Sequence, residues 1–297
     1  MRVFVTGASG HLGSAVVPEL LKAGHSVVGL ARSDASAAVL ADWGAHVRRG
    51  DLDDLDGLRE AAAASDGVVH LAFKHDLLAT GDYSGAVDAD LAAVRALAEG
   101  LEGSGAPFVG TSGTAMLAGL NRVGTEDDVL GSGARIDAEN VLTAFAGRGV
   151  RPSVVRLPPV VHSTLDTTGF VRTLIAAARA AGRSGYLGDG ANRWPSVHTL
   201  DAARLYRLAL EEAPAGTRLH AVDDEGVPFR QIAEGIGRHL GLPTVSIPAD
   251  EAPTHFGWLA GFVGIDNPTS AELTRERFGW VPAGPGLLDD LGSYFSG

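Results

Sequence analysis

The sequence predicts an α/β protein with a Rossmann-type, doubly wound parallel sheet and a smaller, mainly helical C-terminal lobe. Short valine-rich runs alternate with longer alanine- and leucine-rich segments, in which apolar residues recur every three or four positions. Strands covered on both faces by crossover helices have such apolar runs, and the longer segments have helical spacing. This alternation is typical of a parallel sheet. The predicted strands are residues 2–6, 25–31, 45–50, 67–73, 107–111 and 152–157.

The pattern changes after residue 162. Helical segments dominate the remainder, at residues 169–182, 199–213 and 229–241, with short extended pieces between them. We therefore expect residues 1–162 to form a dinucleotide-binding domain, with later returns of the chain to the sheet. Residues 163–297 are expected to form a substrate lobe that closes over the sheet, without a flexible linker between the two parts.

Composition limits the classes of function. The net charge of −12 over 297 residues argues against sequence-independent binding of nucleic acid, and equally against docking on an anionic membrane. Cysteine is absent, which excludes disulfides, thiolate metal sites and a cysteine nucleophile, and no metal site is predicted. Apolar runs fall short of the roughly 20 residues of a membrane span. The first predicted strand begins almost at residue 1, so no targeting segment is expected and a cytoplasmic location is predicted.

A glycine-rich segment, TGASGHLG at residues 6–13, follows the first strand and opens a helix. This context favours a dinucleotide-binding loop over an ordinary tight turn. Glycines let the backbone approach a pyrophosphate closely, while N–H groups at the helix end point at it. The residues expected to contact the cofactor here are Gly7, Ser9, Gly10, His11, Leu12 and Gly13.

The end of the second strand indicates which nicotinamide cofactor is bound. An acidic residue there would bind the adenosine ribose hydroxyls of NAD, whereas arginine can pair with the 2′-phosphate of NADP. Arg32 and Ser33 occupy this place, so NADP(H) is favoured over NAD(H). Asp34 is the alternative: it is either that acidic residue or the N-cap of the following helix.

Together these motifs resemble the extended short-chain dehydrogenase/reductase superfamily, in the branch of nucleotide-sugar epimerases and dehydratases. Further matching segments are HLAF at 70–73, TSGT at 111–114, RLPPVV at 156–161 and WPSVHTLDAARL at 194–205. The resemblance implies that Asp51 and Leu52 flank the adenine and that Pro158 to Val160 lie near the nicotinamide. It also implies cofactor contacts for Ala72, Phe73, Lys74 and Thr111.

The catalytic pair of that superfamily is missing. Its members carry a tyrosine that donates a proton and a lysine four residues later; in the segment LGSGARIDAEN those places hold Gly131 and Arg135. No tyrosine in the chain is followed by lysine at that spacing. Arg135 could still hold the nicotinamide ribose, although it is a poor proton donor. The alternative is an exposed helix residue paired with Glu139. Because Gly131 leaves the volume of the tyrosine empty, a roomier pocket is expected, which Gly131→Tyr should block.

Other residues could replace the missing proton donor. Ser112 and Thr114 follow the fifth strand, at the sheet edge where ligands bind, although turn-stabilising hydroxyls are equally consistent with the sequence. His75 is the first candidate acid and His162 the second, because histidine titrates near neutral pH. Each of these histidines is more often a loop residue bonded to backbone. His70 lies within a strand and is expected to be structural.

Two further segments carry structural predictions. Asp201 is expected to cap the helix that follows it, while Trp194 and Val197 pack the lobe against the sheet domain. The predicted helix 88–101 carries Leu91, Val94, Leu97 and Leu101 on one face. In the related superfamily this helix and the helix that carries the tyrosine, here expected to include Gly131, form a dimer contact, so a homodimer is predicted. The alternative is that this face packs on the sheet.

Three functions are consistent with these observations. The first is an NADP(H)-dependent carbonyl reductase that acts on a small organic molecule with an unconventional proton donor. The second is a cofactor-binding regulatory or sensor protein without turnover, and the third a lyase, isomerase or cyclase on the same fold. Retention of the three glycines and of Arg32 favours the first two. The retained segments TSGT and AFKHD at the substrate edge favour the enzyme narrowly.

Overall fold

A central parallel sheet organises the molecule. The computed structural model describes residues 1–79 and 81–295. Seven strands lie in the order β10-β6-β5-β4-β1-β2-β3, and every pair is parallel. All six predicted strands are present and a seventh joins them from late in the chain, which confirms the Rossmann-type fold. The strands are β1 Arg2–Thr6, β2 Ser26–Ala31, β3 His46–Arg49, β4 Gly67–His70, β5 Pro107–Gly113, β6 Arg151–Leu157 and β10 Thr217–His220.

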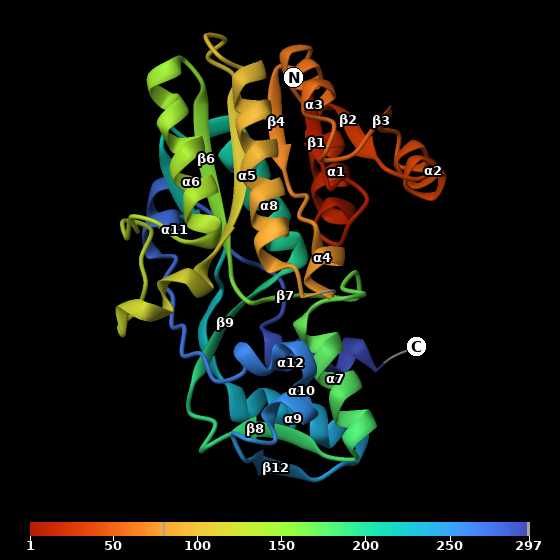
Figure 1. Cartoon of the computed structure of the whole chain (residues 1–297), viewed down its shortest axis with the longest axis vertical. Helices are drawn as coiled ribbons and strands as arrows, with labels where there is room; N and C mark the ends of the chain where they lie inside the picture. Colours follow the sequence, from red (N-terminus) through yellow and green to blue (C-terminus); the bar gives the residue numbers. More distant parts are fainter. Residues whose placement is uncertain (80, 296–297) are drawn as a thin grey trace.

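Helices cover both faces of this sheet (Figure 1). One face packs against α1 Gly13–Lys22, α2 Asp34–Asp42 and α8 Thr199–Glu212. The other packs against α3 Leu55–Ala63, α5 Tyr83–Gly100 and α6 Ala134–Ala144. The strand order reverses between β1 and β4, since the chain first runs outward to β3 and then returns to the other side of β1. In such sheets, ligands bind at the carboxyl ends of the strands where the order reverses.

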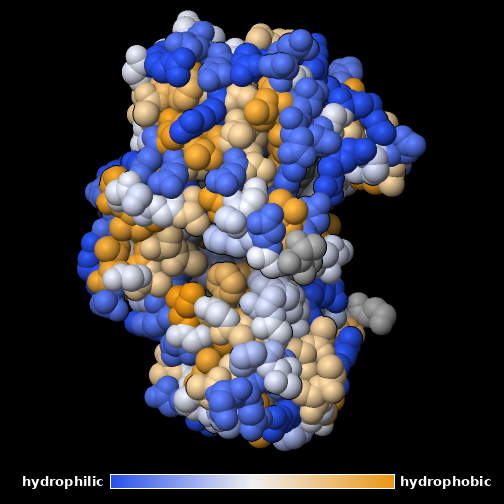
Figure 2. Space-filling view, in the orientation of Figure 1, coloured by the Kyte–Doolittle hydropathy of each residue, from blue (hydrophilic) through white to orange (hydrophobic). Residues whose placement is uncertain are grey.

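The C-terminal lobe has its own apolar core below the sheet domain (Figure 1). It contains a three-stranded sheet of β7 Val160–His162, β9 Arg193–His198 and β11 Asp224–Pro228 and a two-stranded sheet of β8 Ser184–Leu187 and β12 Thr244–Ile247. Figure 2 shows the surface hollowed between the sheet domain and the lobe. The helices of the lobe are α7 Phe170–Ala181, α9 Phe229–Leu240, α10 Ala252–Phe256 and α12 Leu287–Asp290, with η3 Gly257–Gly261 and η4 Leu291–Tyr294. Helix α11 Glu272–Phe278 contacts β10. Before the lobe come α4 His75–Ala79, η1 Thr114–Leu120 and η2 Phe145–Arg148.

Part of the chain after residue 163 belongs to the sheet layer rather than to the lobe. Helix α8 packs into the core beside α1, and β10 extends the sheet, with Leu219 opposite Val155 of β6. The sheet domain is therefore assembled from two separate stretches of sequence.

The start of α8 differs from the prediction. The helix begins at Thr199, and its N-cap is His198, whose Nδ1 accepts a 3.4 Å hydrogen bond from the Leu200 N–H. Asp201 lies inside the first turn and is buried, where its carboxylate accepts the backbone N–H groups of Ala283 and Gly284 at 3.0 and 2.8 Å. The prediction that Asp201 caps the helix is wrong, because it instead binds a returning C-terminal segment.

Trp194 and Val197 of β9 were predicted to pack the lobe against the sheet domain. Trp194 is 1% exposed and lies in the lobe core, with its ring 4.7 Å from that of Phe229. Val197 is fully buried in the core beside α8. Strand β9 thus contributes Trp194 to the core of the lobe and Val197 to the core of the sheet domain.

The apolar face of α5 lies against the sheet. Val94, Leu97 and Leu101 are at most 3% exposed within the core, and Leu91 is half-buried beside them. Packing within one chain therefore accounts for this face, which was the alternative to an intermolecular contact. Among the described residues, no helix combines the length and apolar character needed to cross a lipid bilayer.

Candidate active site

The glycine loop after β1 is packed too tightly for side chains at two positions. Gly7 has φ +66°, and a Cβ on it would lie 2.7 Å from the backbone nitrogen of Ala72 at the end of β4. A Cβ on Gly13 would lie 2.3 Å from the carbonyl oxygens of both Gly7 and Ala8. Contacts this short with backbone require the loop to move, so glycine is needed at both positions.

The N-terminus of α1 is open to a ligand. Within the described chain no side chain caps this helix, which begins after Leu12. Gly10 is exposed and Ser9 is half-buried, so the backbone of the loop is accessible. Unpaired N–H groups at a helix start favour an anion. The loop therefore fits the pyrophosphate of a dinucleotide cofactor.

The side chain of His11 is directed towards the lobe. Its Nε2 lies 2.9 Å from the hydroxyl of Thr199, at the start of α8. Burial lowers the pKa of His11, and the nearby carboxylate of Asp166 opposes that effect. His11 therefore reaches the cofactor region through its backbone, while its ring connects the loop to the start of α8 and lies 3.9 Å from Asp166 of the lobe.

Two ion pairs occupy the expected adenosine end of the site. Arg32 follows β2, its side chain is 68% exposed, and its guanidinium lies 3.3 Å from the carboxylate of Asp76. Asp34 lies 2.9 Å from Arg49, at the end of β3. Because Ser33 caps α2, with its hydroxyl accepting from the Ser36 N–H at 3.1 Å, the alternative in which Asp34 is the cap is wrong.

The segment after β3 lies near the segment after β4. The Lys74 ammonium is 2.5 Å from each carboxylate oxygen of Asp53. Asp51 is exposed and its side chain accepts the Asp53 N–H at 2.8 Å, whereas Leu52 is 8% exposed. An apolar side chain beside exposed polar ones is compatible with the predicted adenine contact, while Lys74 is already engaged by a carboxylate.

Arg135 is held against the carboxyl ends of β4 and β5. Its guanidinium donates a 2.8 Å hydrogen bond to the carbonyl of Thr111 and lies 4.4 Å from the centre of the Phe73 ring. Its side chain is 22% exposed, and its Nε is buried without a partner in the described chain. Glu139, the expected alternative partner, binds Arg156 and Arg218 instead. Arg135 thus lies at the predicted cofactor crevice rather than on the surface.

The hydroxyls of TSGT have different environments. Ser112 is 3% exposed, and its hydroxyl has no hydrogen-bond partner among the described residues. Thr114 is fully buried; its hydroxyl donates to the side-chain oxygen of Asn267 at 2.9 Å, and Asn267 donates back to the Thr114 carbonyl. The Thr111 hydroxyl donates to the His70 carbonyl at 2.7 Å. Of the two candidate relay hydroxyls, only that of Ser112 is therefore unengaged.

The candidate proton donors differ in accessibility. His75 is exposed at the start of α4, and its ring packs edge-on against Phe73 at 5.2 Å. Desolvation and then the Arg135 cation lower the pKa of His75, which therefore is mostly neutral near pH 7. His162 is fully buried and its Nδ1 lies 2.8 Å from Asp290 of α12. His75 is thus the accessible histidine of the pair, whereas His162 connects β7 to α12 within the lobe.

The expected position of Gly131 is wrong. Helix α6 begins at Ala134, so Gly131 lies in the preceding loop, where it is exposed. Apart from its own chain neighbours, no described residue has a heavy atom within 4 Å of a Cβ built on it. A tyrosine at this position would therefore project from the loop, and we expect Gly131→Tyr to be accommodated rather than to block a pocket.

Pro158 and Val160 connect the sheet to the lobe. Both are buried, and Val160 begins β7, where it pairs with Ser196 of β9. They follow the carboxyl end of β6, beside the end of β5. Their contact with the nicotinamide stays a prediction.

One buried acid of this region was not predicted. Asp90 of α5 is 2% exposed and lies 3.8 Å from the Arg135 guanidinium. The sequence carries a signal for it, because positions 90, 94, 97 and 101 share the helical face that packs on the sheet. A carboxylate on that face requires a buried partner.

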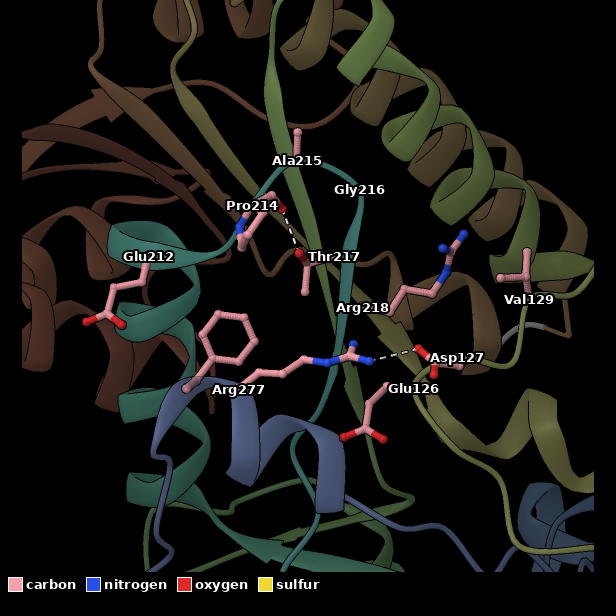
Figure 3. Close-up of a pocket in the computed structure, with 11 residues that line it drawn as sticks. Glu126, Asp127, Val129, Glu212, Pro214, Ala215, Gly216, Thr217, Arg218 and Arg277 are labelled. Atoms are coloured by element: carbon pink, nitrogen blue, oxygen red, sulfur yellow. Dashed lines mark hydrogen bonds and ion pairs between the residues drawn. The ribbon is translucent and has the colours of Figure 1, made fainter.

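A cavity of about 530 Å³ lies elsewhere, at the β10 edge of the sheet (Figure 3). It is lined by the turn before β10 and by residues of α11. Arg277 points to Asp127 at 3.3 Å, and Arg218 is bound to Glu139. Since β10 lies four strands from β1, the cavity is separate from the cofactor crevice. Both arginines of the cavity are already paired with carboxylates.

Comparison with known proteins identifies the family. Residues 3–222 match the model of the NAD dependent epimerase/dehydratase family. The chain belongs to this family.

The similar proteins include an uncharacterized one, a reductase and a sugar-nucleotide-bound structure. The uncharacterized protein YLL056C of Saccharomyces cerevisiae is 45% identical over 301 aligned positions, covering 100% of this chain and 99% of that protein. The 2′-dehydrokanamycin reductase of Streptomyces kanamyceticus is 28% identical, covering 98% of this chain and 79% of that protein. The structure of MoeE5 in complex with UDP-glucose and NAD superposes with a TM-score of 0.77 at 21% identity, covering 99% of this chain and 97% of that one. At this identity, the similarity to MoeE5 shows a shared fold alone.

Proposed function

We propose that the protein is an NADP(H)-dependent carbonyl reductase that acts on a small organic molecule. The observation that carries this proposal is the pair of unsatisfied donors at the carboxyl end of β5. The Ser112 hydroxyl and the Arg135 Nε are both buried and unpartnered in the described chain. An unmet buried donor costs about 1–3 kcal/mol. A ligand oxygen at this edge would satisfy both.

The glycine loop and the residues around Arg135 would hold the cofactor. The backbone around Gly10 and the start of α1 would bind the pyrophosphate, and Arg32 would pair with a 2′-phosphate. Arg135 would lie at the nicotinamide ribose. A bound reduced nicotinamide supplies a hydride for the carbonyl carbon. The presence of NAD in the MoeE5 structure supports a nicotinamide cofactor for this fold.

Arg135 and Ser112 would stabilise the negative charge that develops on the substrate oxygen. Preorganised donors in a site shielded from water lower the barrier to such a reaction. The oxygen then takes a proton from His75 or from water, which completes the alcohol. Arginine remains charged throughout, so it polarises the carbonyl without giving up a proton. Similarity to 2′-dehydrokanamycin reductase supports this class of reaction.

The proposal is tested by mixing the protein and NADPH with a panel of aldehydes and ketones and following the absorbance of NADPH at 340 nm. Oxidation of NADPH that depends on one class of carbonyl compound is the expected result. Tight NADPH binding without turnover on any carbonyl would favour the regulatory protein. Conversion of a substrate without net oxidation would favour the lyase, isomerase or cyclase.

Arg32→Ala is expected to weaken NADPH binding by about tenfold or more and leave NADH binding unchanged, because only NADPH carries the phosphate that the guanidinium would bind. The exposed pair with Asp76 contributes little and can give way to the phosphate. Titration calorimetry with both cofactors measures the effect, with Arg48→Ala on β3 as the control. Equal affinities of the wild type for NADPH and NADH would contradict the prediction.

Reduction is expected to accelerate as the pH falls below 6.5. The donor must be protonated, and the pKa of His75 lies below its ordinary value because of desolvation and the Arg135 cation. The rate should therefore rise by up to about tenfold per pH unit until the lowered pKa is passed, and then level off. His75→Gln should flatten this profile. An unchanged profile in that variant would assign proton delivery to water.

The homodimer remains a prediction. The buried leucines of α5 give it no support, since they pack within one chain. The remaining surface for such a contact is the outer face of α5 and α6. Light scattering at micromolar concentration should give twice the mass of one chain, and a monomer would rule the dimer out.

A further inference from the structure

Asp90 is a charged residue in the apolar layer between α5 and the sheet. It is 2% exposed, and its helix neighbours on that face are Val94 and Leu97. A buried carboxylate without partners would cost several kcal/mol. Its partners therefore indicate why it is there.

Two cationic or hydrogen-bonding groups meet this carboxylate. His70 of β4 places Nε2 3.2 Å from Asp90 Oδ1, and its Nδ1 lies 2.7 Å from the Thr6 hydroxyl at the end of β1. Arg135 places its guanidinium 3.8 Å from Asp90 Oδ2. Burial alone would raise the pKa of Asp90, but the His70 hydrogen bond and the Arg135 cation outweigh it, and the pKa lies below its ordinary value. Asp90 is therefore ionised near neutral pH.

The guanidinium of Arg135 is fixed from three sides. Asp90 attracts it from α5, the Thr111 carbonyl accepts its hydrogen bond at 2.8 Å, and the Phe73 ring lies 4.4 Å away. A free arginine side chain carries about 2 kcal/mol of rotamer entropy. A cation held in place before a ligand arrives avoids most of that loss on binding.

We propose that Asp90 is a positioning residue of the cofactor and substrate site, which acts by holding Arg135 at the carboxyl ends of β4 and β5. The role of Arg135 itself rests on the proposed function. Asp90 touches neither cofactor nor substrate in this assignment. It sets the direction of the guanidinium and offsets its charge, while His70 ties the same carboxylate to the end of β1.

A double-mutant cycle on cofactor affinity tests this proposal. Asp90→Asn keeps the size of the side chain and an oxygen that can accept from His70, but removes the charge that attracts Arg135. NADPH affinity, measured by fluorescence, should fall about fivefold to tenfold in Asp90→Asn. The same substitution should have no added effect in an Arg135→Met background, because coupled residues are not additive. Asp88→Asn, exposed on the same helix, is the matched control.

The outcomes separate positioning from simple packing. A loss of affinity in Asp90→Asn that is equal in both backgrounds, or no loss at all, would overturn the proposal. If wild-type protein binds neither NADPH nor NADH, the proposed function fails, and the positioning role is read from NMR instead. The Arg135 Nε–H resonance, assigned by its absence in Arg135→Met, should be sharp and slow to exchange in the wild type. An exchange-broadened resonance would overturn the proposal even if Asp90→Asn fails to fold.

Discussion

Gly13→Ala is expected to weaken NADPH binding by about a hundredfold. The added Cβ would lie 2.3 Å from two carbonyl oxygens of the glycine loop, and neither backbone atom can move without moving the loop. Each charge-assisted hydrogen bond from the loop to the pyrophosphate is worth about 1.5–3 kcal/mol, so losing one or two accounts for that factor. Fluorescence titration of wild type and variant measures the change.

Gly119→Ala is the matched control for this loop. No heavy atom of the described chain lies within 4 Å of a Cβ at Gly119, and the residue lies outside the cofactor crevice in η1. Its cofactor affinity should equal that of the wild type. Thermal melting of both variants separates misfolding from a local effect. Unchanged affinity in a folded Gly13→Ala protein would remove the glycine loop from the cofactor site.

Arg135→Met is expected to reduce cofactor affinity and turnover together, each by about tenfold or more. Methionine keeps an unbranched apolar side chain here but removes the guanidinium that lies over the Phe73 ring, and with it the charge and the hydrogen bond to Thr111. The loss of a hydrogen bond to a charged group corresponds to about 1.5–3 kcal/mol, which is at least a tenfold change. NADPH titration and steady-state reduction of a substrate found in the carbonyl panel measure the two quantities.

A surface arginine controls for the change of net charge. Arg95→Met removes one cation from the exposed side of α5 and should leave both quantities unchanged. Arg135→Met also removes the cation near Asp90 while the hydrogen bond from His70 stays, so the melting temperature should fall. A lower melting temperature with unchanged affinity and turnover would reduce Arg135 to a structural role.

The inner strands of the sheet were predictable because they are buried on both faces. Runs such as residues 2–6 and 107–111 are short and apolar, and the structure makes strands of both. The glycine loop was predictable for a related reason. Backbone contacts at Gly7 and Gly13 leave no room for any other residue, so the requirement appears directly in the sequence.

The contacts of polar side chains were less predictable, because they depend on segments far apart in the chain. Asp201 binds the backbone of residues 283 and 284, and Thr114 binds Asn267, so neither was recognisable from neighbouring residues. The boundary of α6 was not predictable either. The helix begins at Ala134, so Gly131 lies before it and not within it as expected. Asp90 could have been found from helical periodicity, although its pairing with Arg135 of α6 could not.

The position of β10 determines when the sheet can be completed. Its partner β6 ends at Leu157, yet β10 does not begin until Thr217, after β7, β8, β9 and α8 have been made. During synthesis, the edge of β6 that pairs with β10 therefore has no partner strand until about 60 further residues have left the ribosome. A fragment that stops at residue 162 would keep that open edge and would also lack α8 over one face of the sheet. Such a fragment should aggregate. In a chimera that takes its lobe from another family member, α8 and β10 should therefore come from the same protein as the sheet.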